Sequence, residues 1–234
     1  MNIFLSIIDC LKIFFQALRF GVLNILFENS NSNLIRALGF LNPFFIVNHK
    51  VPQGLRIKNF LESLGPMFIK FGQLLSTRTD VVPLEITSYL RGLTDQCQSF
   101  PTHKAKQIIE DSLKIKIEDV FEGFEEQPLA AASLAQVHRA RIKNTSEKVV
   151  VKVLRPGIHK KVRRNVRVMR AGGFLLKIFY KESERLRLKD VIDDYEKTIF
   201  KELDLKVEAA NTTVTKKNFD NSDLLFIPKV FWDQ

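Results

Sequence analysis

The fold of this chain is decided by residues 128–157, which read PLAAASLAQVHRARIKNTSEKVVVKVLRPG. Alternating and β-branched residues predict two strands, at 135–142 and 147–154. The polar residues 143–146 between them predict a turn, so the two strands form an antiparallel hairpin. The Arg-Pro-Gly sequence at 155–157 ends the second strand, because a proline cannot donate a ladder hydrogen bond.

Helical patterns precede the hairpin. Residues 57–93 show helical spacing of apolar side chains, with interruptions at Gly65-Pro66 and near Pro83. Residues 105–113 continue as a helix, for which Thr102 is the expected N-cap.

Helical patterns also follow the hairpin, at residues 159–180 and 189–218. The last stretch, 224–231, predicts one more strand that Pro228 interrupts. The order of helices, a short hairpin, helices and a strand predicts an α+β fold.

Composition bounds the function. The chain has 234 residues, of which 45% are hydrophobic and 26% charged, as in folded domains. Two cysteines and four scattered histidines exclude a disulfide framework and a zinc site, and they favour a reducing compartment. The net charge of +10 admits nucleic acid, anionic lipid or a phosphorylated ligand as partner. Nucleic acid is disfavoured, because most aromatic residues lie outside the basic stretch.

Residues 1–27 are mostly apolar and predict a helix with one polar stripe, formed by Asp9, Lys12, Gln16 and Arg19. That stripe argues against a transmembrane span, and the segment lacks the basic start and cleavage site of a signal peptide. Two interpretations stay open. The helix lies in a membrane surface with its apolar face down, or it packs against its own domain.

A basic run follows the hairpin, and helical spacing places most of it on one face. This face is either solvated or in contact with anionic lipid head groups. Its members are Lys160, Lys161, Arg163, Arg164, Arg167 and Arg170.

The hairpin also carries residues suited to phosphate binding. The small residues at 130–133 let the backbone approach a phosphate closely, and Lys152 on the paired strand supplies positive charge. Such a lysine needs a carboxylate partner from a nearby helix. Asp204 and Glu208 share a face of the predicted helix 189–218, whereas Glu202 is rotated away from Glu208. Taken alone, the small-residue loop is more typical of a packed turn, the strand lysine of a solvent-exposed lysine, and the acidic helix of a solvated face; only the order and spacing of the three favour phosphate binding.

Four motifs together resemble the UbiB family of atypical, protein-kinase-like proteins, most closely its bacterial members of ubiquinone biosynthesis. They are the Lys-Phe-Gly-Gln segment at 64–78, the alanine-rich loop at 128–138, the strand 149–152 with the turn at 155–157, and the Glu-Leu-Asp helix at 195–211. Similarity runs from about residue 56 to the last residue. The alanine-rich loop replaces the glycine-rich loop of ordinary kinases.

The resemblance implies roles for particular residues. Lys152 contacts the α and β phosphates and pairs with Glu208. Lys70 and Gln73 lie on a helical extension and form a gating motif with Glu202 and Asp204. The loop over the ATP phosphates comprises Leu129, Ala130, Ala131, Ala132, Ser133, Leu134, Ala135, Gln136 and Val137.

The implied architecture is a protein-kinase-like N-lobe, a small antiparallel sheet with a helix, preceded by an α-helical extension. Residues 1–55 form an apolar helical segment, 56–127 the extension with the Lys-x-Gly-Gln motif, and 128–234 the N-lobe. Family members are roughly twice as long, and their second lobe carries the catalytic-loop Asp and the magnesium-binding Asp. We expect these residues beyond Gln234, so the chain reads as truncated, with the C-lobe absent and no metal ligand of its own.

The implied function is an atypical kinase or ATPase that uses ATP or ADP with Mg²⁺ in support of ubiquinone biosynthesis. The expected location is the cytoplasmic face of a bacterial inner membrane, as a peripheral protein. Expected partners are the nucleotide, membrane lipids and other ubiquinone-biosynthesis proteins, without nucleic acid. The alternative is a non-catalytic, lipid-binding scaffold that retains the N-terminal half of the family.

Overall fold

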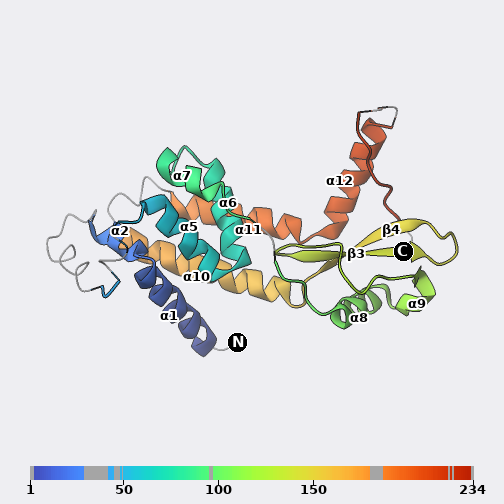
Figure 1. Ribbon diagram of the computed structural model, residues 1–234, viewed down its shortest axis with the longest axis horizontal. Coiled ribbons are helices and arrows are strands. Elements are labelled where there is room, and N and C mark those ends of the chain that lie inside the picture. Colours follow the sequence, from blue (N-terminus) through green and yellow to red (C-terminus); the bar gives the residue numbers. More distant parts are fainter. Residues whose placement is uncertain are drawn as a thin grey trace. The chain divides into compact units, whose positions relative to one another are not determined.

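A computed structural model describes residues 3–28, 42–44, 48, 50–94, 97–179, 187–220, 222 and 224–232 (Figure 1). The chain divides into two compact units, which we treat separately. The helical unit comprises Met1–Gln96 and Lys160–Glu196. The sheet unit comprises Cys97–His159 and Lys197–Gln234.

The helical unit contains the predicted N-terminal helices. Its elements are α1 (Ile3–Arg19), α2 (Val22–Glu28), α5 (Gln53–Leu64), α6 (Pro66–Thr77), α7 (Leu84–Leu90) and most of α10 (Ile158–Phe179) and α11 (Leu188–Glu202). The predicted break at Gly65-Pro66 is confirmed, since Gly65 has φ +95° and Pro66 begins α6. The predicted single helix over 1–27 is wrong, because Gly21, at φ +66°, separates α1 from α2.

Close helix packing in this unit depends on Gly72 of α6. A Cβ atom built on Gly72 would collide with the side chains of Leu93 and Leu61. The buried side chains of Leu61 and Leu93 fill the space that a side chain at position 72 would need. Gly172 of α10 is different, since a Cβ atom there would meet nothing within 4 Å.

Substituting these two glycines by alanine is expected to have opposite effects on stability. Gly72→Ala should lower the free energy of unfolding by about 1–3 kcal/mol, because it overpacks a filled contact. Gly172→Ala should raise it by about 0.5–1 kcal/mol, because alanine restricts the unfolded chain and favours helix. Thermal unfolding followed by circular dichroism measures both. Equal effects of the two substitutions would contradict this account of Gly72.

The sheet unit is built around one long strand, β3 (Ala135–Ile142). It pairs antiparallel with β4 (Lys148–Leu154), β1 (Phe121–Glu122) and β2 (Ala130–Ala131). Helices α8 (Thr102–Leu113), α9 (Ile117–Val120) and α12 (Leu205–Asn218) complete the unit. The predicted hairpin is confirmed within one residue, and so is the α+β class.

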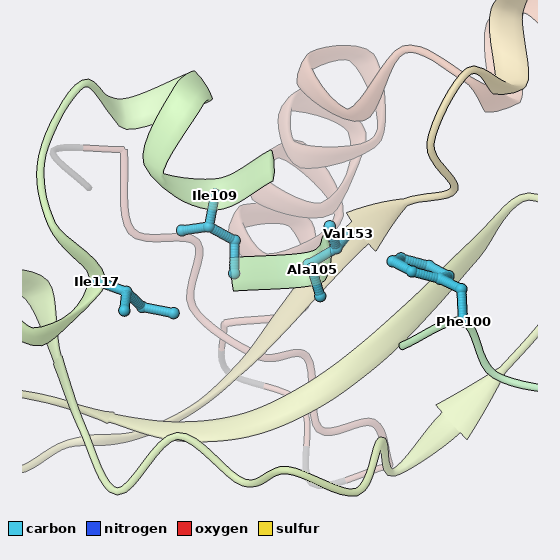
Figure 2. Packing of buried hydrophobic residues seen from close by; sticks show 5 residues of the cluster. All are labelled: Phe100, Ala105, Ile109, Ile117 and Val153. Atoms are coloured by element: carbon cyan, nitrogen blue, oxygen red, sulfur yellow. The ribbon is translucent and has the colours of Figure 1, made fainter. Parts of the chain in front are cut away.

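The core of the sheet unit lies between α8 and β4. Ala105 and Ile109 of α8 pack with Val153 of β4 (Figure 2). Phe100, which precedes α8, and Ile117 of α9 complete this cluster. These contacts group residues 97–127 with the sheet, whereas the predicted segments place them in the helical extension. Residues 160–196, predicted as part of the N-lobe segment, group with the helical unit instead.

Three local predictions for residues 102–231 are wrong. Pro101 is the N-cap of α8, and the hydroxyl of Thr102 donates instead to the carbonyl of Glu126. The predicted helix 189–218 is two helices, α11 and α12, separated at Leu203-Asp204. The predicted strand 224–231 is not a strand, although residues 224–232 are all described.

The last of these corrections has a structural cause. The segment is tied to α12 by side chains, because Lys216 donates to the carbonyl of Ile227 at 3.1 Å. The indole of Trp232 donates to the hydroxyl of Thr213 at 3.2 Å. Pro228 lacks the N–H that a ladder needs.

Candidate functional site

Lys152 and Glu208 form an ion pair in the sheet unit. The ammonium Nζ of Lys152 lies 2.7 Å from Oε1 and 2.6 Å from Oε2 of Glu208. The contact expected between them is therefore present, across 56 residues of sequence. Both side chains are partly exposed, at 40% and 49%, so the pair contributes little to stability. Its consequence is geometric, since it holds the ammonium group in one place on the sheet.

The position of Glu208 is set by the start of α12. Asp204 is the N-cap of this helix, and its Oδ1 accepts hydrogen bonds from the backbone N–H groups of Lys206, at 3.0 Å, and Val207, at 3.2 Å. Glu208 lies in the first turn, where the helix dipole favours a negative charge. The prediction that Asp204 shares a helix face with Glu208 is wrong, because Asp204 precedes the helix and caps it.

The alanine-rich loop and Lys152 share one face of the sheet. The cross-strand register aligns Ala130 with Val137 and Val137 with Lys152. Residues directly opposite each other in antiparallel strands project from the same face. Ala130 and Lys152 are exposed and Val137 is half-buried, so this row faces away from the core around Val153.

The loop itself is only partly accessible. Leu129, Ala130 and Ala132 are exposed, and Ala131 and Val137 are half-buried. The remaining predicted nucleotide residues are buried, namely Ser133, Leu134, Ala135 and Gln136. Side chains from the first part of the loop can therefore touch a ligand, whereas those of 133–136 belong to the interior.

Gln136 illustrates this division. Its side chain is fully buried; Oε1 accepts from the N–H of Phe100 at 3.0 Å, and Nε2 donates to the carbonyl of Phe100 at 3.2 Å. Nε2 also lies 2.8 Å from Nε2 of His138, whose Nδ1 lies 2.9 Å from the carbonyl of Glu125. Since a carbonyl only accepts, His138 carries its proton on Nδ1 and accepts from Gln136. The amide of Gln136 thus joins β3 to the segment before α8.

The predicted gating residues are divided between the two units. Lys70 and Gln73 lie on α6 in the helical unit, where Nε2 of Gln73 donates to the carbonyl of Leu93 at 3.1 Å. Glu202 and Asp204 lie in the sheet unit. Within the helical unit α6 is fixed to α11, because the buried hydroxyl of Tyr195 donates to the carbonyl of Met67 at 2.8 Å.

Two groups of ion pairs in the helical unit shift the pKa values of their members. The guanidinium of Arg78 donates to both oxygens of Asp80, each at 2.9 Å, and this lowers the pKa of Asp80 below its ordinary value. Arg170, a member of the basic run, lies 2.6 Å from Glu196 and 2.7 Å from Asp193. The hydrogen bond to Glu196 raises the pKa of Arg170. Arg170 is therefore engaged with acids of α11.

In the part of the chain that the structure describes, no three or more His, Cys, Asp or Glu side chains lie together in a way that could hold a metal ion. None of the helices in the described part of the chain is long and apolar enough to span a bilayer.

The chain is similar to a known protein family and to several curated proteins. A family model described as ABC1 atypical kinase-like domain matches residues 92–234, which include the whole sheet unit. The curated relative in Azotobacter vinelandii, named probable protein kinase UbiB, is 43% identical over 202 residues, which is 85% of this chain and 37% of the relative. Relatives of the same name in Marinobacter nauticus and Pseudomonas paraeruginosa are 45% and 46% identical over 79% of this chain and 34% of theirs.

The chain thus spans about a third of the length of the curated relatives it matches. Among solved structures, one described as the complex of Rv3197 with erythromycin from Mycobacterium tuberculosis aligns with a TM-score of 0.45. It is 23% identical and covers 84% of this chain and 46% of that chain. From the family model and the relatives, the chain belongs to the UbiB family of ABC1 atypical kinase-like proteins.

Proposed function

We propose that the sheet unit binds the phosphates of ATP or ADP, as the nucleotide-binding part of an atypical kinase or ATPase that supports ubiquinone biosynthesis. The observation that carries this proposal is the row Ala130, Val137 and Lys152 on one exposed face, with Glu208 bound to the lysine. A small-residue loop and a fixed cation on one face suit an anionic ligand. Membership of a kinase-like family supports the choice of a nucleotide.

Each group in this site has a separate task. The ammonium group of Lys152 neutralises charge on the α and β phosphates, and Glu208 keeps it oriented toward them. Small side chains at 130–132 allow the backbone to approach the phosphates. Mg²⁺ would be held by the nucleotide itself and would supply further neutralisation of the phosphate charge beside Lys152.

The same proposal includes a gating role for Lys70 and Gln73 of α6. Asp204, the predicted acidic member of this motif, is engaged within the sheet unit, where its Oδ1 accepts two backbone N–H groups as the N-cap of α12. Lys70→Ala should then change the preference between ATP and ADP. An unchanged ratio of the two affinities would contradict the role of Lys70.

Titration of the isotope-labelled chain with Mg²⁺ and ATP tests the nucleotide proposal. The amide resonances of residues 129–132 and of Lys152 should shift in a saturable manner, while those of α5 and α7 in the helical unit stay unchanged. NMR measures all of these in one spectrum. Uniform small shifts, or no shift at millimolar nucleotide, would contradict binding at this site.

We also propose peripheral attachment to the cytoplasmic face of a bacterial inner membrane through α1. This helix leaves large apolar side chains exposed while it buries Ala17 and half-buries Gln16. An apolar face of this kind inserts into a lipid interface, and exposed lysines at the start of α10 add attraction to anionic head groups. The exposed residues are Ile8 (45%), Leu11 (61%), Phe14 (55%) and Phe15 (53%).

Flotation with vesicles of phosphatidylethanolamine and phosphatidylglycerol tests this attachment. The double substitution Leu11→Ser with Phe14→Ser should reduce the bound fraction several-fold, because it removes apolar area that enters the lipid. Leu84→Ser is a matched control, since Leu84 of α7 is 68% exposed. Equal binding of wild type and the double variant would contradict attachment through α1.

A further inference from the structure

Arg155 directly follows β4, and its side chain contacts the backbone of the alanine-rich loop. Its Nε donates to the carbonyl of Ala132 at 2.9 Å, and its NH2 donates to the carbonyl of Gln98 at 2.8 Å. The guanidinium carbon lies 5.8 Å from the ring centre of Phe100. The backbone N–H of Arg155 also donates to the carbonyl of Leu134 at 2.9 Å. One residue therefore contacts the loop twice and the segment before α8 twice.

A second contact holds the loop from the same segment. The N–H of Cys97 donates to the carbonyl of Ala131 at 3.3 Å. The carbonyl oxygens of Ala131 and Ala132 are thus both engaged with donors from the protein. This matters for an anion, because a carbonyl oxygen that turned toward a phosphate would repel it, whereas N–H groups attract it.

We propose that Arg155 is a positioning residue that holds the alanine-rich loop in the conformation that accepts a nucleotide phosphate. This inference rests on the proposed nucleotide function of the sheet unit and deepens it. Arg155 acts through the backbone of Ala132, and its charged hydrogen bonds are stronger than those between neutral groups.

The geometry requires arginine rather than lysine. The two carbonyl acceptors belong to separate segments, at Ala132 and Gln98, and the planar guanidinium places one donor on each while it stacks on Phe100. A lysine ammonium is a point charge on a flexible stem, so it can reach one carbonyl but lacks the rigid fork. Arg155→Lys should therefore restore only part of the function.

Equilibrium dialysis of the full chain with Mg²⁺ and ATP measures the effect. Arg155→Gln should raise the dissociation constant about 10-fold and Arg155→Lys about 3-fold. The matched control is Arg141→Gln, which removes the same charge from an exposed position on β3. Arg141 pairs with Lys148, at the opposite end of the hairpin from the alanine-rich loop. The Arg141→Gln variant should therefore bind ATP with the affinity of wild type.

Hydrogen exchange without nucleotide provides an independent readout. Amides 130–134 should exchange faster in Arg155→Gln than in wild type, while amides 138–142 of β3 keep their protection and show that the sheet is folded. Wild-type affinity and loop protection in Arg155→Gln would overturn the role of Arg155 and leave nucleotide binding intact. Absence of nucleotide binding by wild type would overturn the proposed function itself, and with it the role of Arg155 in nucleotide binding.

Discussion

Replacing Lys152 by alanine is expected to weaken binding of Mg²⁺ and ATP on the order of 100-fold. The substitution removes the ammonium group that faces the same side of the sheet as the alanine-rich loop. It also leaves the carboxylate of Glu208 without its partner, next to the phosphates that it would repel. Both changes weaken the binding of the nucleotide. Equilibrium dialysis with labelled nucleotide measures the loss.

Lys148→Ala is the matched control for this prediction. Lys148 is an exposed lysine at the start of the same strand, so its removal changes the net charge equally. Its dissociation constant should stay within about 2-fold of wild type at physiological salt, because exposed charges farther away than the Debye length are screened. Equal losses in the two variants would mean that net charge, and not the site at Lys152, attracts the nucleotide.

Replacing Gln136 by leucine is expected to destabilise the sheet unit by about 3 kcal/mol or more. Leucine has a similar size but no hydrogen-bonding groups. The N–H and carbonyl of Phe100 and the ring nitrogen of His138 would all lose their buried partner. A buried polar group without a hydrogen bond costs about 1–3 kcal/mol. Loss of the bridge between β3 and the segment before α8 adds to this cost.

Denaturant unfolding followed by tryptophan fluorescence measures this loss. The chain has a single tryptophan, Trp232, which lies in the sheet unit and bonds to α12. The unfolding midpoint of Gln136→Leu should therefore fall well below that of wild type. Arg139→Ala, at an exposed position three residues along the same strand, should change the free energy of unfolding by less than about 0.5 kcal/mol. An unchanged midpoint for Gln136→Leu would show that its hydrogen bonds are dispensable.

Much of the sheet unit could be predicted from sequence because its signals are local. The alternation at 135–142 and the β-branched run before Lys152 specify two strands, and the polar residues between them specify the turn. The pairing of Lys152 with Glu208 could be expected from the family resemblance, and the structure contains it. The role of this pair in nucleotide binding stays a prediction.

The break in the predicted helix 189–218 is local, since Asp204 accepts from the N–H groups of Lys206 and Val207 and so caps α12. Two other features depend on contacts between distant segments. The sequence places Gln136 in the nucleotide loop, and only the fold brings Phe100 next to it. The sequence shows Arg155 only as the first residue after a strand, because its acceptors at Ala132 and Gln98 become neighbours only in three dimensions.

Labelling with an acyl-phosphate derivative of ATP tests the central claim most directly. Such a probe transfers its acyl group to the amine of a lysine beside the phosphates, with ATP as the leaving group, and mass spectrometry identifies the lysine. Lys152 should be acylated ahead of the exposed Lys148 and Lys160, and excess ATP with Mg²⁺ should prevent the reaction. Labelling of all three lysines to the same extent, unaffected by ATP, would contradict a phosphate site at Lys152.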